Sequence, residues 1–132
     1  MKQAWQRLAA CRRGASAIEF ALAVPVLALF LAGLAQLGVL FAANAGLKEA
    51  VDEGARYASI YPRPSDASII SRVQARGFAL KAADLATPVL THGTSNGLPY
   101  VDISASYTAR TSFILFTGPT VVLTSTRRAY QN

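Results

Sequence analysis

The sequence is poor in the residues that build disulfides, metal centres and most active sites. Its 132 residues include a single cysteine, Cys11, and a single histidine, His92. One cysteine excludes an intramolecular disulfide and a cysteine-based metal cluster. We find no glycine-rich phosphate loop, no Ser/His/Asp set and no metal-ligand spacing, and His92 lies in a polar stretch where we expect it to be solvated. The sequence therefore predicts a chain that is not an enzyme and that holds no cofactor.

Acidic residues are missing from the N-terminal segment, where the basic residues gather. Lys2, Arg7, Arg12 and Arg13 all precede the first acid, Glu19, within a chain of net charge +6. A basic chain can indicate a nucleic-acid partner. Here the cluster adjoins a long apolar run, so the positive-inside rule is the simpler interpretation. We therefore predict a basic cytoplasmic leader over residues 1–14 and no nucleic-acid partner.

The apolar run covers residues 15–43 and contains one charged residue, Glu19. About 20 apolar residues suffice to cross a bilayer core. The large apolar side chains of the run contribute about −4 to −8 kcal/mol to insertion, whereas a central acid costs about 3 kcal/mol. The run therefore predicts a transmembrane helix. A cleaved secretory signal is the alternative, because Ala42–Ala45 offers small residues, but the run is long for a signal core.

The helical pattern continues beyond the membrane segment. Apolar residues keep a helical stripe, and Lys48, Asp52 and Arg56 are spaced for ion pairs along one exposed face. Pro62 and Pro64 then end the pattern. We expect one long helix over residues 15–61, with an extramembrane extension over residues 44–61. Pro25 lies inside the span, where a membrane helix tolerates it.

A ridge of small residues follows the same helix at every fourth position. Such a ridge lets another backbone approach closely. Glycine costs about 1 kcal/mol of helix propensity relative to alanine, so its repeated use favours a helix-packing face over a helix that is merely alanine-rich. The residues of this ridge are Gly38, Ala42, Gly46, Ala50, Gly54 and Ala58.

The junction between the leader and the apolar run has a specific order of residues. Two arginines are followed by Gly14 and Ala15, and Glu19 and Phe20 then lie inside the apolar run. An ionisable residue within a span is a functional candidate by default. The alternative is that the carboxylate of Glu19 only reaches back to the interface.

This junction resembles the cleavage site of prepilins of the Flp/Tad class. Taken with the stretch Arg13–Leu22, with Pro25 and with Glu53–Ala58, it is similar to the TadE-like family, the pilin-like minor components of tight-adherence pilus machines. The resemblance covers the N-terminal part of the chain. The remainder is similar to the family only in its general plan.

The resemblance implies that a prepilin peptidase cuts between Gly14 and Ala15, and that Glu19 and Phe20 serve assembly. It further implies other pilin-like subunits, a major pilin, the peptidase and an inner-membrane assembly platform as partners. The implied location is the bacterial inner membrane, crossed once, with the N-terminus cytoplasmic and the C-terminal domain periplasmic.

The head, residues 62–132, is predicted to mix one helix with strands. Ser65 and Asp66 offer a cap for a helix over residues 66–83. Residues 88–99 are expected to form a loop with a turn at residues 92–97. Alternating apolar and polar residues from Tyr100 onward predict a half-buried strand. Gly118 and Pro119 are expected to interrupt the strand pattern. A second strand over residues 121–126 then completes a small α+β head.

Four consecutive large apolar residues, Phe113–Phe116, are too few to cross a membrane. We interpret them as core, because the head has few other large residues to bury. The alternative is an edge that touches lipid or a partner.

The sequence as a whole predicts an α+β chain with a long N-terminal transmembrane helix and a small head. Through the resemblance, we expect a non-enzymatic role in Flp/Tad-type pilus assembly. The alternative from a different class is a single-pass, membrane-tethered binding module of the cell envelope.

Overall fold

The computed structural model describes residues 12–112 and 117–131. Backbone contacts divide the chain into two units, Met1–Ala35 and Gln36–Asn132. Most of the predicted leader and the segment Phe113–Phe116 lie outside the described residues.

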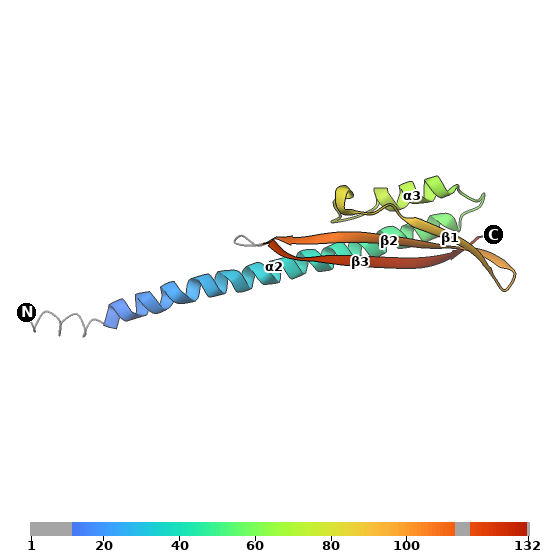
Figure 1. Ribbon diagram of the computed structural model, residues 1–132. Coiled ribbons are helices and arrows are strands. Elements are labelled where there is room, and N and C mark those ends of the chain that lie inside the picture. The colour runs from blue at the N-terminus through green and yellow to red at the C-terminus, as the bar shows by residue number, and fades with distance from the viewer. Residues whose placement is uncertain (1–11, 113–116, 132) are drawn as a thin grey trace, which may run out of the picture. The chain divides into compact units, whose positions relative to one another are not determined.

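Helix α2 (Arg12–Ala58) is the longest element and continues from the first unit into the second (Figure 1). It contains Pro25 and ends four residues before Pro62. The predicted single long helix is therefore confirmed. In the described part of the first unit, every side chain from Ser16 to Leu31 is exposed, including the large apolar ones.

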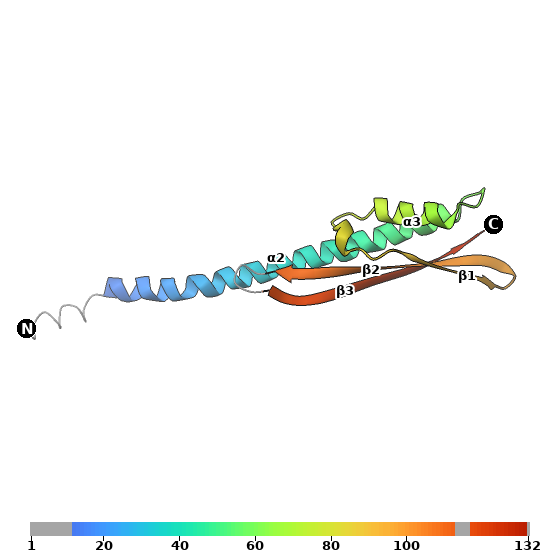
Figure 2. The same cartoon turned by 45° about the horizontal axis from the view of Figure 1, so that its top comes forward.

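The second unit, which we call the C-terminal unit, joins the rest of α2 to the other elements. These are α3 (Asp66–Ala75), a 3₁₀ turn η1 (Ala82–Asp84), β1 (Val89–Ser95), β2 (Leu98–Ser112) and β3 (Thr117–Tyr130). The described strands form one antiparallel sheet in the order β1-β2-β3. Figures 1 and 2 show α3 beside the C-terminal part of α2. The α+β fold class is confirmed.

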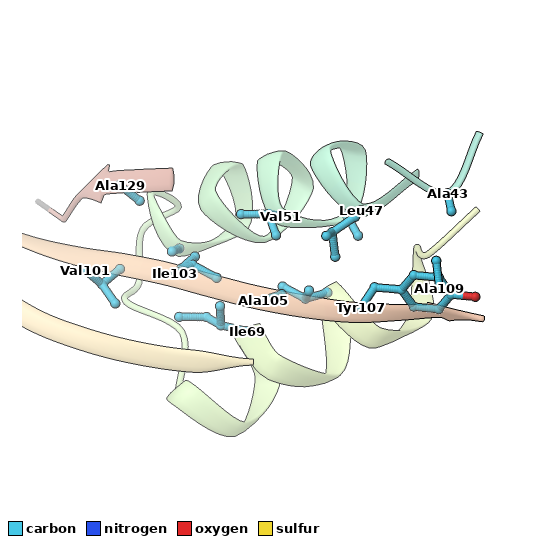
Figure 3. Close-up of a cluster of buried hydrophobic side chains, with 13 residues drawn as sticks. Ala43, Leu47, Val51, Ile69, Val101, Ile103, Ala105, Tyr107, Ala109 and Ala129 are labelled. Carbon is cyan, nitrogen blue, oxygen red and sulfur yellow. The ribbon is translucent and has the colours of Figure 1, made fainter. Parts of the chain in front are cut away.

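The core of the C-terminal unit lies between the helices and one face of the sheet. Alternate residues of β2 point into it, as strand geometry requires. The largest fully buried side chains come from α2, α3 and β2, and Figure 3 shows several of them pointing toward one another. They are Leu47, Val51, Ile69, Val73, Val101 and Ile103.

Helix α3 begins where the sequence predicts and ends earlier. The hydroxyl of Ser65 accepts a hydrogen bond from the backbone N–H of Ser68 (3.3 Å), so the predicted cap is present. The predicted extension to residue 83 is wrong, because the helix ends at Ala75. Gly77 follows, and Ala79 adopts a left-handed conformation (φ 56°) that a right-handed helix cannot continue through.

The predicted loop over residues 88–99 is also wrong, because most of it is strand. β1 pairs with β2, and Asn96 and Gly97 form the two-residue connection between them with φ values of 51° and 78°. Two positive φ values are the requirement of a type I′ hairpin turn, for which Asn-Gly is the preferred pair. His92 consequently lies in a strand and not in a loop.

Both strands predicted toward the C-terminus are present, and the second is longer than expected. β3 includes Gly118 and Pro119, so the prediction that these two residues interrupt the strand pattern is wrong. The register shifts between Arg110 and Ser112, which leaves Gly118 and Pro119 opposite Thr111. A bulge on an edge strand accommodates proline because no ladder hydrogen bond from its nitrogen is required.

The two glycines of α2 at residues 38 and 46 provide a matched test of this packing. A Cβ atom at Gly46 would overlap the carbonyl oxygen of Phe78, whereas one at Gly38 would meet nothing within 4 Å. We expect Gly46→Ala to lower the free energy of unfolding by about 1–3 kcal/mol, because backbone must move to make room. Gly38→Ala should be neutral or stabilising by about 1 kcal/mol through helix propensity.

The measurement is denaturant unfolding of the full chain in detergent, followed by near-ultraviolet circular dichroism. Equal midpoints for the two variants would contradict the close approach of α2 to Phe78.

Candidate assembly surfaces

The residues predicted at the processing site lie in the first turn of α2. Gly14 and Ala15 have helical backbone, and Glu19 and Phe20 follow about one turn later on the same helix. Glu19 is exposed, and so is Phe20. Apart from Ser16, the exposed side chains around Glu19 are apolar, so among the described residues it is an isolated acid on a helix surface suited to lipid.

The six residues of the small-residue ridge fall into two groups. Gly46, Ala50, Gly54 and Ala58 are buried within the C-terminal unit, and a Cβ at Gly54 would overlap a methyl carbon of Val73. This part of the ridge packs closely against α3 and the loop that follows it. Gly38 is exposed and Ala42 is half-buried. Only this N-terminal part of the ridge remains open to another chain.

Ion pairs surround the buried part of α2. Asp52 pairs with Arg127 of β3, in place of the predicted Lys48 and Arg56. Glu53 pairs with Arg72 of α3 (3.3 Å) and, more loosely, with Arg56 (3.9 Å). These contacts join α2 to β3 through Asp52 and to α3 through Glu53.

Tyr57 completes this region from the last turn of α2. The guanidinium of Arg72 lies 5.4 Å from the centre of its ring, and the ring is half-buried. Two shallow cavities of about 170 and 180 Å³ flank Glu53 and Arg56. Their lining mixes acids with arginines, so neither cavity presents one sign of charge to a ligand.

The outer face of the sheet carries a second polar cluster. Arg128 of β3 donates two hydrogen bonds of 2.8 Å to the carboxylate of Asp102 on β2, and its guanidinium lies 3.8 Å from the ring centre of Tyr100. The hydrogen bonds from Arg128 lower the pKa of Asp102, and the same contacts raise the pKa of Arg128. Tyr130 packs edge-on against Tyr100, with ring centres 6.3 Å apart.

Sequence reasoning missed the contacts of His92. Its Nε2 lies 3.0 and 3.1 Å from the two carboxylate oxygens of Asp66, and a guanidinium nitrogen of Arg63 lies 3.1 Å from Nδ1. An arginine can only donate, so Nδ1 accepts and Nε2 carries the proton. The histidine thus links β1 to the start of α3. The signal that could have placed His92 in a strand is the Asn-Gly pair, because such a turn predicts a strand on either side of it.

Taken together, these features define a class of protein. The described residues contain one helix long and apolar enough to cross a membrane. Its C-terminal part belongs to a small α+β unit, so the chain is of the kind that joins a single apolar N-terminal helix to a C-terminal head.

The family comparison agrees with the resemblance found in the sequence. Residues 14–56 match the model of the TadE-like protein family, so the chain carries a TadE-like N-terminal segment and the predicted resemblance is confirmed there. The matched segment begins at Gly14 and ends two residues before the end of α2. No curated protein and no solved structure matches the chain. Proteins of this family are membrane proteins associated with Tad pili.

The Asp102–Arg128 pair predicts an acid-dependent contribution to stability. The pKa of Asp102 is lowered in the folded chain, so the pair stabilises above the ordinary carboxyl pKa, and this contribution is lost as pH falls from about 4 through the lowered value. Asp102→Asn should lower the thermal midpoint at pH 7, and its difference from the parent chain should shrink toward pH 2.

Arg128→Gln serves as the matched partner in a double-variant cycle of thermal midpoints. At pH 7 the thermal midpoint of the double variant should fall by less than the sum of the decreases in the two single variants. Additive losses at pH 7, or a difference that does not change with pH, would contradict the pairing.

Proposed function

We propose that this chain is a non-enzymatic, pilin-like membrane protein that takes part in the assembly of a Flp/Tad-type pilus. The observation that carries the proposal is the match of residues 14–56 to the TadE-like family, which coincides with α2. The orientation of the chain in the membrane follows from the positive charges of the leader. Lys2, Arg7, Arg12 and Arg13 keep the N-terminus in the cytoplasm, and the head lies on the periplasmic side of the inner membrane.

Processing after Gly14 explains the order of residues at the start of α2. Removal of the leader leaves a new α-amine on Ala15, at the end of a helix whose following side chains are apolar except for Ser16 and Glu19 over the first two turns. A charged amine in or near lipid is costly unless it has a partner. Glu19 supplies the carboxylate that neutralises the amine of a neighbouring subunit. The pair then sets the register between adjacent helices.

The proposed partners follow from the same logic. A prepilin peptidase acts on the junction, and other pilin-like subunits and the major pilin pack against the exposed apolar surface of α2. The inner-membrane assembly platform receives the complex. Gly38 and Ala42 form the open part of the ridge, where another helix can approach closely.

Processing is tested by co-expressing the full chain with its cognate prepilin peptidase. We expect the intact mass and the N-terminal sequence of the membrane form to begin at Ala15. Gly14→Val should remain uncut, because a branched side chain then flanks the scissile bond, whereas Gly33→Val serves as a control inside the span and should be processed normally. An uncut N-terminus in the parent chain would end the processing proposal.

The role of Glu19 is tested by comparing Glu19→Gln with Glu19→Ala. Both variants should insert into the membrane normally, because removing an acid from the span only favours insertion. Both should reduce piliation, since neither supplies the negative charge that the new amine requires. Ser16→Ala is the control for a polar side chain in the same region. Normal piliation in Glu19→Gln would contradict a charge-based role.

A further inference from the structure

The loop that follows α3 exposes a large aromatic side chain. The N–H of Phe78 donates to the carbonyl of Arg76 (2.8 Å), and that of Leu80 donates to Gly77 (3.4 Å). Leu80 packs against the core, but 67% of Phe78 is exposed. Between them Ala79 adopts φ 56°, a conformation that disfavours residues with a Cβ. Such strain at a non-glycine residue calls for a functional explanation. We call residues 77–81 the aromatic loop.

The aromatic loop lies at the end of the C-terminal unit where α2 enters it. Gly46 of α2 approaches the carbonyl oxygen of Phe78 so closely that a side chain has no room. The backbone N–H of Lys81 faces the hydroxyl of Tyr107 at 3.5 Å. Figure 3 shows Tyr107 at the same end of the core as Ala43. Both contacts therefore fix the loop at the level of residues 43–46 of α2.

The residues of α2 just before this level are apolar and exposed. Leu37, Val39 and Phe41 lie within the C-terminal unit, and 70% of Phe41 is exposed. A run of about 20 residues ending at Phe41 is the length that crosses a bilayer core. From Phe41 to Gly46 a helix rises about 7–8 Å. The headgroup layer of one leaflet is about 5–7 Å thick, so a span that ends at Phe41 would place Gly46 at the outer limit of this layer.

The charge of the aromatic loop suits this level. The side chain of Lys81 is exposed, and among the described residues it forms no ion pair. A lysine near a membrane surface is attracted to the negative charge of anionic lipid phosphates. An aromatic ring is favoured at the headgroup level beside it.

We propose that the aromatic loop docks on the membrane surface, with Phe78 among the headgroups and Lys81 against the phosphates of anionic lipids. This inference rests on the proposed membrane anchoring of α2. It goes beyond that anchoring by giving the C-terminal unit a second contact with the bilayer. The left-handed backbone at Ala79 lies between Phe78, which is exposed, and Leu80, which packs against the core.

The test places single tryptophans in the full chain, in a Trp5→Phe background, reconstituted in nanodiscs. Phe78→Trp reports on the loop, and Phe41→Trp reports on the anchor. Ile60→Trp is the matched control, because Ile60 is also a large exposed apolar residue (54%) but lies just beyond the C-terminal end of α2. The probe is phosphatidylcholine and phosphatidylglycerol with acyl chains brominated near the headgroup.

We expect the bromines to quench Phe78→Trp and Phe41→Trp and to leave Ile60→Trp unchanged. Quenching of Phe41→Trp without quenching of Phe78→Trp would overturn the docking inference and leave the anchor intact. No quenching at Phe41→Trp would instead contradict the anchor. Crosslinking of Phe78 to a second copy of the chain, in place of quenching, would also overturn lipid docking.

Lys81→Gln tests the charge contribution on the same readout. In the Phe78→Trp background, it should reduce the extra quenching that phosphatidylglycerol gives over pure phosphatidylcholine. Arg56→Gln is the matched control, because it removes one positive charge about 15 Å farther along α2 than Gly46, and it should have no such effect. Equal responses of the two variants would contradict a specific role for Lys81.

Discussion

The close approach of α2 to α3 and the aromatic loop is the contact on which the C-terminal unit depends. Glycine at residues 46 and 54 removes the side chains that would hold these elements apart. Because the elements can approach closely, the core between them fully buries Leu47, Val51 and Ile103. Each buried aliphatic side chain contributes about 1.5–3 kcal/mol, which exceeds the helix propensity that a glycine gives up.

Helix α2 meets two different environments along its length. Up to Phe41 its large apolar side chains are mostly exposed, which suits lipid, and from Ala43 onward one face is buried in protein. The small-residue ridge crosses this boundary. Before the boundary, the small residues are available to another membrane helix. Beyond it, the same spacing accommodates elements of the same chain.

The polar contacts of the C-terminal unit direct its packing more than they stabilise it. Asp52–Arg127 and Glu53–Arg72 lie at the rim of the core, where exposed ion pairs contribute about 0–1 kcal/mol each. Their value is geometric, since they join α2 to the edge strand and to α3. His92 performs the same task between β1 and the start of α3.

The sequence by itself determined the features that depend on local periodicity. The apolar run and its helical continuation defined α2, Ser65 defined the start of α3, and the alternation after Tyr100 defined β2. Each of these is specified by neighbouring residues, because helix and strand periods and caps act within a few positions. The order of residues from Gly14 to Glu19 led to the resemblance with the TadE-like family, whose model matches residues 14–56.

Only the tertiary structure decided the features that join residues far apart in the chain. β1 is largely exposed and lacks a clear apolar alternation, so its own residues give no strand pattern, and apart from the Asn-Gly turn after it only its pairing with β2 makes it a strand. Asp52 had two suitable partners on its own helix, but folding brought Arg127 to it. The spacing of small residues along α2 was visible in the sequence, and four of the six are buried within the C-terminal unit. Which elements cover the C-terminal part of the ridge depended on where the chain returns after Pro62, and such long-range contacts carry no local signal.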